Sequence, residues 1–298
     1  MRRSCSKSPD DGHGDLPGLD TFKGEILHSA TFQNGADYKG KRAMVVGTGN
    51  SAHDVAQDLY MKGAEEVSIL QRGPTCVVSL QPSAEMIYKI YSNGDPLEDV
   101  DLIAASTPYP VLVDAYRSIS QKAAQIDADM LQALNDKGLK TYFGEDGTGF
   151  QMMFMRGKGG YYIDVGCADL IADGKVDIVQ HSEMDHVEAN GMRMKDGSLI
   201  PLDLLVLATG FKNMQENIRL IFGDMVAERV GPVWGFDEHH QMRGMWRRTG
   251  QDGFWITGGS LLDSRIFSRY LAIEVKAALL GMLPARSELP LAEKVEAI

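Results

Sequence analysis

The sequence predicts an α/β fold built on a parallel sheet, and three observations indicate it. Short apolar runs at residues 42–46 and 203–207 are typical of strands that are buried on both faces of such a sheet. Apolar residues recur at helical spacing over residues 52–59, directly after the first run. A further short strand pattern follows at residues 67–70. Residues 41–72 are therefore expected to form one β-α-β unit.

The same periodicities predict elements elsewhere, except over residues 150–165, which give no assignment. Residues 1–20 are rich in Ser, Asp, Gly and Pro and are expected to be a tail or linker. The other expected elements are helices at 83–91, 110–137, 169–172 and 266–280, strands at 176–179 and 254–257, and an antiparallel meander over 187–200 with turns at Asn190-Gly191 and Asp196-Gly197.

Composition excludes several classes of protein. The formal charge of the 298 residues is −11, whereas a nucleic-acid-binding protein normally shows a basic surface. The cysteines, Cys5, Cys76 and Cys167, form no CxxC, which argues against a disulfide scaffold, a zinc site and a dithiol redox centre. No apolar run approaches the roughly 18 residues of a membrane span, and no signal-peptide core is present. We therefore expect a cytoplasmic protein with no integral membrane segment, no nucleic-acid partner and no metal site.

The clearest motif is Gly47-x-Gly49-x-x-Ala52, which stands between the first strand and its helix. In this glycine fingerprint the first glycine makes a tight turn, and the second lets the backbone approach a pyrophosphate. The small third residue allows close packing of helix and strand, and the helix N-terminus holds the anion. The sequence therefore predicts a doubly wound, dinucleotide-binding (Rossmann-like) domain. The alternative is a glycine-rich turn in a generic α/β protein. The predicted binding residues are Gly47, Gly49, Asn50, Ser51 and Ala52.

The end of the next strand indicates which dinucleotide is bound. A site for NAD usually has an acidic residue there to hold the ribose 2′-hydroxyl. This chain has Gln71-Arg72 instead, and an arginine can bind a 2′-phosphate. We therefore predict NADPH, with Arg72 at its 2′-phosphate; the alternative is that Arg72 is a solvated loop residue.

Two further motifs flank the β-α-β unit. The first, which we call the histidine motif, is Phe22-x-Gly24-x-x-x-His28-x-x-x-Phe32; the second is the ATG motif, Ala208-Thr209-Gly210. With the glycine fingerprint between them, they make residues 17–284 resemble the class B flavoprotein monooxygenases. Phe32 stands where the Baeyer–Villiger members tend to carry tryptophan, so the flavin-containing monooxygenase branch is the closer match.

The resemblance implies two cofactors, FAD and NADPH, and a small-molecule substrate. NADPH would reduce FAD, and a flavin hydroperoxide would then oxygenate the substrate. It also implies that an NADPH domain is inserted into an FAD domain, and that Ala208, Thr209 and Gly210 lie at the cofactor-binding link between them. The implied organisation is a tail and linker at 1–40, an NADPH-binding domain at 41–202 and the C-terminal part of an FAD-binding domain at 203–298.

One departure limits what the resemblance implies. The family begins with a second GxGxxG that binds FAD, and no such fingerprint stands upstream of residue 41. The chain therefore resembles a family member without its N-terminal FAD-binding segment, and no catalytic residue is assigned. An NADP-binding protein without oxygenase activity is the main alternative. A relative of the pyridine-nucleotide disulfide reductases is another, although the absence of CxxC counts against it. Neither the substrate nor the oligomeric state follows from the sequence.

Overall fold

The computed structural model describes residues 16–283, and the chain divides into two compact units. The first unit comprises the described residues up to Pro96 together with Thr107–Lys212. The second comprises Leu97–Ser106 together with the described residues from Asn213 onward. Each unit is described separately below.

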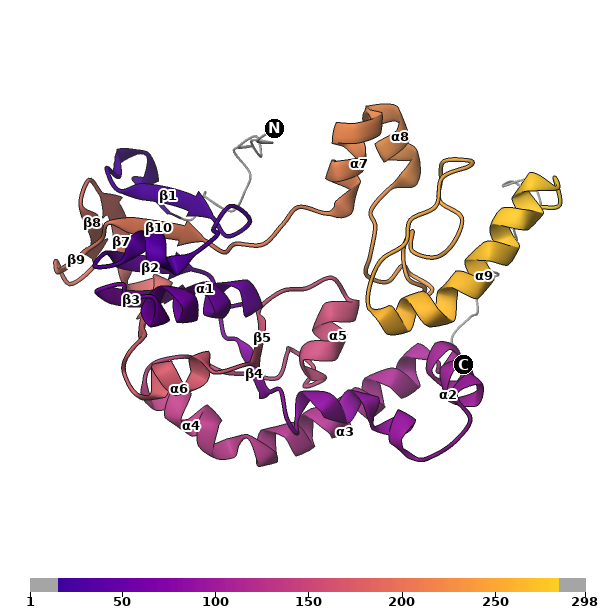
Figure 1. Cartoon of the computed structure of the whole chain (residues 1–298), viewed down its shortest axis with the longest axis horizontal. Coiled ribbons are helices and arrows are strands. Elements are labelled where there is room, and N and C mark those ends of the chain that lie inside the picture. The colour runs from indigo at the N-terminus through magenta and orange to yellow at the C-terminus, as the bar shows by residue number, and fades with distance from the viewer. Residues whose placement is uncertain (1–15, 284–298) are drawn as a thin grey trace. The chain divides into compact units, whose positions relative to one another are not determined.

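A five-stranded parallel sheet forms the centre of the first unit. Its order is β1-β10-β2-β3-β6, and every neighbouring pair is parallel. Figure 1 labels β1, β10, β2 and β3 of this sheet. The predicted α/β fold with a parallel sheet is thus confirmed, and only β1, a short and half-buried edge strand, was not predicted. The strands are β1 Glu25–His28, β10 Leu204–Leu207, β2 Arg42–Val46, β3 Glu66–Gln71 and β6 Asp177–Gln180.

Both faces of this sheet are buried, which explains the continuous apolar runs of its strands. Ala43 and Val45 face a core that helix α1, Asn50–Met61, completes with Ala52 and Leu59. Met44, on the opposite side of β2, faces a second core. That second core is covered by the meander of β7 Met184–Glu188, β8 Gly191–Met194 and β9 Leu199–Pro201.

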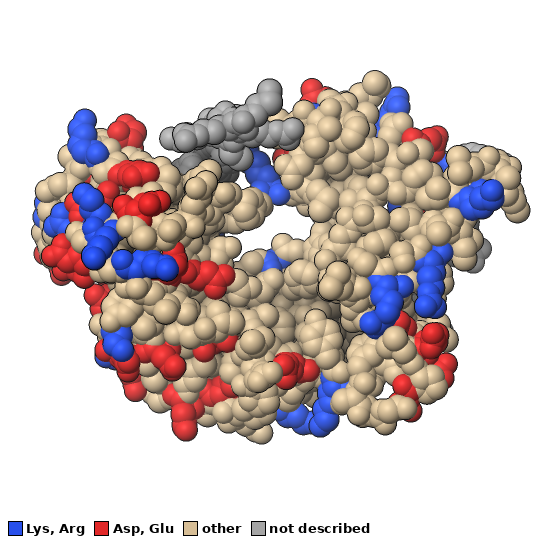
Figure 2. Space-filling view, viewed as in Figure 1, with Lys and Arg blue, Asp and Glu red and all other residues tan. Residues whose placement is uncertain are grey.

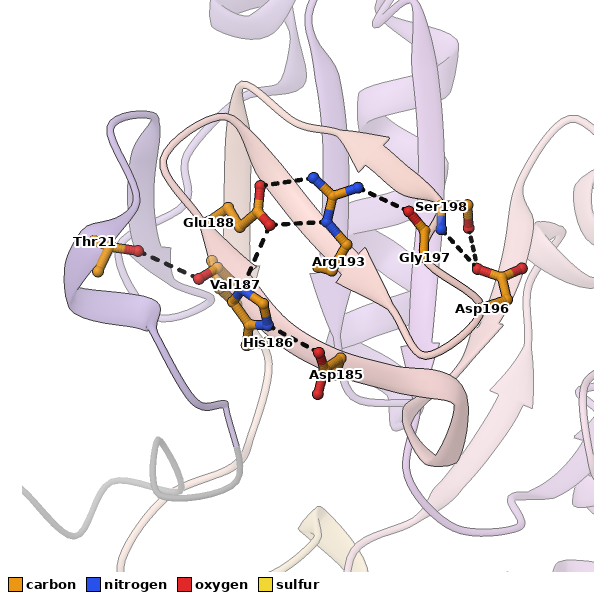
Figure 3. Close-up of polar contacts among 9 residues, drawn as sticks. All are labelled: Thr21, Asp185, His186, Val187, Glu188, Arg193, Asp196, Gly197 and Ser198. Carbon is orange, nitrogen blue, oxygen red and sulfur yellow. Dashed lines mark hydrogen bonds and ion pairs between the residues drawn. The ribbon is translucent and has the colours of Figure 1, made fainter.

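The meander confirms the predicted antiparallel strands and both of their turns. Arg193 donates from Nε and Nη2 to the carboxylate of Glu188 at 2.8 and 3.0 Å, across the β7–β8 pair. Ser198 donates from its backbone N and its hydroxyl to Asp196 Oδ1, which closes the second turn (Figure 3). The hydroxyl of Thr21 donates to Val187 O at 3.3 Å, so the segment before β1 is attached to the meander.

The middle of the chain forms a smaller α/β layer in the same unit. Its parallel strands are β4 Cys76–Ser79 and β5 Tyr161–Asp164, and β5 lies within the stretch that the sequence left unassigned. Residues 110–137, predicted to be helical, form two helices, and at the break between them the buried carboxylate of Asp127 accepts from Ser79 N and Ser79 Oγ. The helical elements are η4 Ala84–Ser92, α3 Tyr109–Ile126, α4 Ala128–Asp136, α5 Gly149–Met155 and α6 Cys167–Ala172.

The second unit is helical. The strand predicted at 254–257 is wrong, since only isolated bridges form there, at Trp255 and Ile256. The predicted C-terminal helix begins earlier than expected, at a capping box between Ser260 and Asp263. Arg265 makes a two-pronged ion pair with Asp101 at 2.9 and 2.6 Å. The helices are α2 Leu97–Ser106, α7 Met214–Phe222, α8 Asp224–Val230 and α9 Leu261–Leu279.

The described surface adds two general observations. On the face drawn in Figure 2, acidic and basic side chains are interspersed and form no continuous basic surface. Within residues 16–283, no helix combines the length and the apolar character that crossing a membrane requires.

Candidate nucleotide-binding site

The three sequence motifs meet at one edge of the main sheet. His28 ends β1, the ATG motif follows β10, and the glycine fingerprint follows β2. Because the strands are parallel and in register, with His28 beside Leu207 and Leu207 beside Val46, their carboxyl ends are level. The carboxyl edge of such a sheet is where α/β proteins bind ligands.

The first fingerprint glycine is required by the fold itself. Gly47 has a φ of 119°, a backbone conformation that favours glycine. A Cβ at this position would lie 2.5 Å from the carbonyl oxygen of Ala208, in the ATG motif. Gly47 therefore allows the fingerprint and the ATG motif to approach one another closely.

The folded backbone does not require a glycine at the second fingerprint position. Gly49 has a φ of −82° and a ψ of −177°, which any residue adopts. The nearest atom to an added Cβ would be Tyr161 O at an ordinary 3.7 Å. What a side chain here would obstruct is a ligand at the N-terminus of α1, where the first backbone N–H groups have no partner within the helix. The residues therefore fit a dinucleotide pyrophosphate.

The other predicted fingerprint residues differ in exposure. Ser51 is exposed in the first turn of α1, and Ala52 is fully buried against the sheet. The side chain of Asn50 serves the protein, because its Oδ1 accepts from Ile163 N at 2.8 Å. Asn50 therefore retains its backbone N–H and its amide Nδ2 as hydrogen-bond donors. The roles of these residues in binding remain predictions.

His28 connects the histidine motif to the ATG motif. Its Nδ1 accepts from Ala30 N at 3.1 Å, so its Nε2 carries the proton and donates to Gly210 O at 3.0 Å. Its ring meets the exposed ring of Phe211 edge-on, with centroids 5.2 Å apart. Elsewhere in the motif, Phe22 is buried and Phe32 stacks on Tyr38. The structure thus gives this histidine a positioning role for the ATG loop. Thr209, like Gly210, is exposed.

Arg72 is exposed at the carboxyl end of β3, beside a buried polar network that the sequence analysis missed. The fully buried amide of Gln71 accepts from Lys140 N at 2.8 Å and donates to Lys140 O at 2.9 Å. It also donates to Thr75 Oγ1, which in turn donates to Thr48 Oγ1 inside the fingerprint at 2.6 Å. A buried glutamine at the end of an apolar strand was the available signal. The network connects the end of β3, directly before Arg72, to the glycine fingerprint.

The described thiols do not provide a nucleophile. Cys76 and Cys167 are both fully buried, and burial raises the pKa of each to about 12. Neither is a thiolate near neutral pH, so covalent cysteine chemistry has no support here. Among residues 16–283, no three His, Cys, Asp or Glu side chains are grouped as a metal site would require.

The chain is similar in sequence to known flavin-binding monooxygenases. Residues 8–212 match the model of the flavin-binding monooxygenase-like (FMO-like) family. The chain is 30% identical over 207 residues to the probable indole-3-pyruvate monooxygenase YUCCA10 of Arabidopsis thaliana, covering 68% of this chain and 47% of that protein. It is 27% identical over 239 residues to the FAD-containing monooxygenase EthA of Mycolicibacterium smegmatis, covering 78% and 45%.

A solved structure of oxidised steroid monooxygenase bound to NADP aligns with a TM-score of 0.47 and 17% identity, over 73% of this chain and 49% of that one. The chain spans about half the length of the two curated relatives named above. Because the family model matches more than half of the chain, this chain belongs to the flavin-binding monooxygenase-like family.

Proposed function

We propose that this chain carries the NADPH-binding site of an FAD- and NADPH-dependent monooxygenase of the flavin-containing type. It would act in the cytoplasm on a small-molecule substrate. Membership of the FMO-like family supports the enzyme class and the use of FAD. The geometry at the carboxyl edge of the sheet supports NADPH binding at the glycine fingerprint.

The observation that carries the proposal is the contrast between the two fingerprint glycines. The fold requires Gly47, because a side chain there would strike Ala208 O. The fold does not require Gly49, whose backbone is open to any residue and whose Cβ would meet no close atom. A glycine that the folded chain does not need, at the N-terminus of a helix, is what close approach of a pyrophosphate requires.

The residues at this edge have separable tasks in the proposal. The backbone of Gly49, Asn50 and Ser51 would bind the pyrophosphate, and Arg72 would bind the 2′-phosphate. The ATG motif, held by His28, would border the same edge from β10. When bound, NADPH supplies hydride and FAD supplies the chemistry of oxygenation. The assignment of 41–202 to NADPH and of 203–298 to FAD belongs to this proposal, and β10, at the start of the latter segment, lies between β1 and β2 in the sheet.

Nucleotide titration tests the proposal directly. The purified chain would be titrated with NADPH and with NADH, and binding would be measured by calorimetry. FAD would then be added, and flavin absorbance and NADPH-dependent oxygen uptake recorded. Saturable NADPH binding supports the assigned site, and flavin-dependent oxygen uptake supports the enzyme class. Absence of any NADPH binding would overturn the proposal.

A further inference from the structure

His53 lies one turn into α1 and takes no part in the predicted nucleotide contacts. Its side chain is fully buried. Its Nδ1 lies 3.1 Å from the carbonyl oxygen of Gly49, and a carbonyl can only accept, so Nδ1 carries the proton and donates. Burial lowers the pKa of His53 from its usual 6.5 to about 4, so the ring is neutral at physiological pH.

The ring of His53 is held in place by β5, more than a hundred residues further along the chain. It stacks on Tyr162 with a centroid separation of 3.9 Å and an interplanar angle of 3°. The hydroxyl of Tyr162 donates to Asp164 Oδ1 and accepts from Val165 N and Cys167 N. The hydroxyl of Tyr162 is thereby held by three hydrogen bonds, and its ring lies parallel to the imidazole.

The same strand contacts the fingerprint helix at two neighbouring points. Ile163 N donates to Asn50 Oδ1 at 2.8 Å, and Tyr161 O lies closest to the position of a Cβ on Gly49. Two consecutive residues of β5, Tyr162 and Ile163, thus contact the N-terminal part of α1. The main sheet forms the other side of this part of the helix, so the fingerprint is supported by two separate sheets of the first unit.

The hydrogen bond from His53 has a geometric consequence for the fingerprint. The oxygen of Gly49 also accepts from Ala52 N at 3.0 Å and from His53 N at 3.2 Å. These donors fix the plane of the peptide that joins Gly49 to Asn50. Because a trans peptide holds its N–H opposite to its C=O, a carbonyl drawn into the helix directs the N–H of Asn50 outward from the helix N-terminus. That is where the pyrophosphate is proposed to bind.

The other ring nitrogen indicates that packing alone does not explain the histidine. His53 Nε2 is buried and has no hydrogen-bond partner. An unsatisfied buried acceptor destabilises the folded state, and an apolar ring would fill the same space without that cost. A group that is unfavourable for stability yet bonded to the fingerprint backbone is typical of a functional position.

We propose that His53 is a positioning residue for nucleotide binding, which holds the Gly49–Asn50 peptide so that the Asn50 N–H faces the pyrophosphate. The inference rests on the proposed function, since it concerns the same site. The inference extends the proposed function because it assigns part of the NADPH affinity to a buried side chain that the nucleotide does not contact. The ring of Tyr162 and strand β5 are then parts of the binding apparatus.

The variants His53→Asn and His53→Gln test this inference, because both introduce an amide side chain but the two side chains differ in length. In His53→Asn the amide nitrogen can occupy the position of Nδ1, whereas in His53→Gln it reaches toward the position of Nε2. His53→Phe keeps a ring against Tyr162 and removes the donor. We expect NADPH affinity to fall roughly three- to tenfold in His53→Phe and His53→Gln, by the net value of one hydrogen bond, and to be retained in His53→Asn.

A matched control separates positioning from general loosening of the helix. Leu59 is fully buried on the same helix, away from its N-terminus. Leu59→Val should lower the melting temperature without changing NADPH affinity, whereas His53→Phe should lower affinity without lowering the melting temperature. Equal NADPH affinity in the wild type, His53→Phe and His53→Gln would overturn the inference and leave the proposed function standing. A wild type that does not bind NADPH would overturn both.

Discussion

The imidazole of His28 donates from Nε2 to the carbonyl oxygen of Gly210 at 3.0 Å, across the adjacent ends of β1 and β10. This contact joins residues that are 182 positions apart in the sequence. The histidine motif and the ATG motif, which the sequence shows only as separate segments, are therefore in direct contact. The ATG loop is held from one side by His28 and from the other by its close approach to Gly47.

Removal of this contact should loosen the ATG loop. We expect His28→Phe, which keeps an aromatic ring beside Phe211, to reduce the free energy of unfolding by about 1–2 kcal/mol through the loss of two hydrogen bonds. His28→Gln places an amide donor near the position of Nε2 and should recover part of this loss. Chemical denaturation of the three proteins measures the effect. Identical stability of the Phe variant and the wild type would show that the loop is held by packing alone.

Nucleotide choice should depend on Arg72. If Arg72 binds the 2′-phosphate, the wild type binds NADPH better than NADH, by about 10- to 150-fold for a charge-assisted contact of roughly 1.5–3 kcal/mol. Arg72→Ala should weaken NADPH binding to near that of NADH and leave NADH binding unchanged. Lys62→Ala, an exposed cation just after the C-terminal end of α1, is the matched control and should change neither affinity. Calorimetric titration of each protein with NADPH and with NADH measures these affinities. Equal wild-type affinities for the two nucleotides would contradict the assignment of Arg72 to the 2′-phosphate.

The two fingerprint glycines should respond differently to the same substitution. Gly49→Val should abolish NADPH binding while the circular dichroism spectrum stays native, because the backbone there accepts a side chain. Gly47→Val should destabilise the whole first unit, since its side chain would strike the Ala208 backbone. Gly159→Val is the control, because nothing lies within 4 Å of its Cβ position and its φ is not positive. If Gly49→Val binds NADPH as tightly as the wild type, the fingerprint is a structural turn and not a nucleotide-binding site.

The buried neutral His53 should make stability depend on pH in a defined window. The pKa of His53 is about 4 in the folded protein and 6.5, its usual value, in the unfolded chain. Above pH 6.5 the imidazole is neutral in both the folded and the unfolded protein, so its titration does not change the stability there. Between pH 6.5 and about 4 the unfolded chain binds a proton that the folded chain does not, and stability falls as the pH falls. The loss should approach roughly 3 kcal/mol, at about 1.4 kcal/mol for each unit of pKa difference.

Denaturation curves at a series of pH values measure this slope. His53→Phe has no group to titrate at this position and should make the curve less steep between pH 6.5 and 4, leaving the losses that other groups cause. The ion pair of Asp203 with Arg42 is one such contribution, and it belongs to a lower range because hydrogen bonding to Arg42 lowers the pKa of Asp203 from 3.8 to about 2. A His53→Phe variant with the full wild-type slope would show that other groups cause it.

Much of the fold followed from local patterns. The strands β2, β3 and β10 are short and buried on both faces, so their apolar runs identify them without knowledge of their neighbours. Helix α1 shows its buried stripe at helical spacing. The strand expected at 254–257 was wrong because an aromatic, β-branched run resembles a strand even where no adjacent segment completes a ladder.

The sequence by itself determined the glycine fingerprint, its place between a strand and a helix, and the α/β class, because each depends on residues a few positions apart. Only the tertiary structure decided that β1 lies beside β10, that Asn50 bonds to Ile163, and that His53 stacks on Tyr162. These contacts join residues more than a hundred positions apart. They form only when the whole unit packs, so no local pattern encodes them.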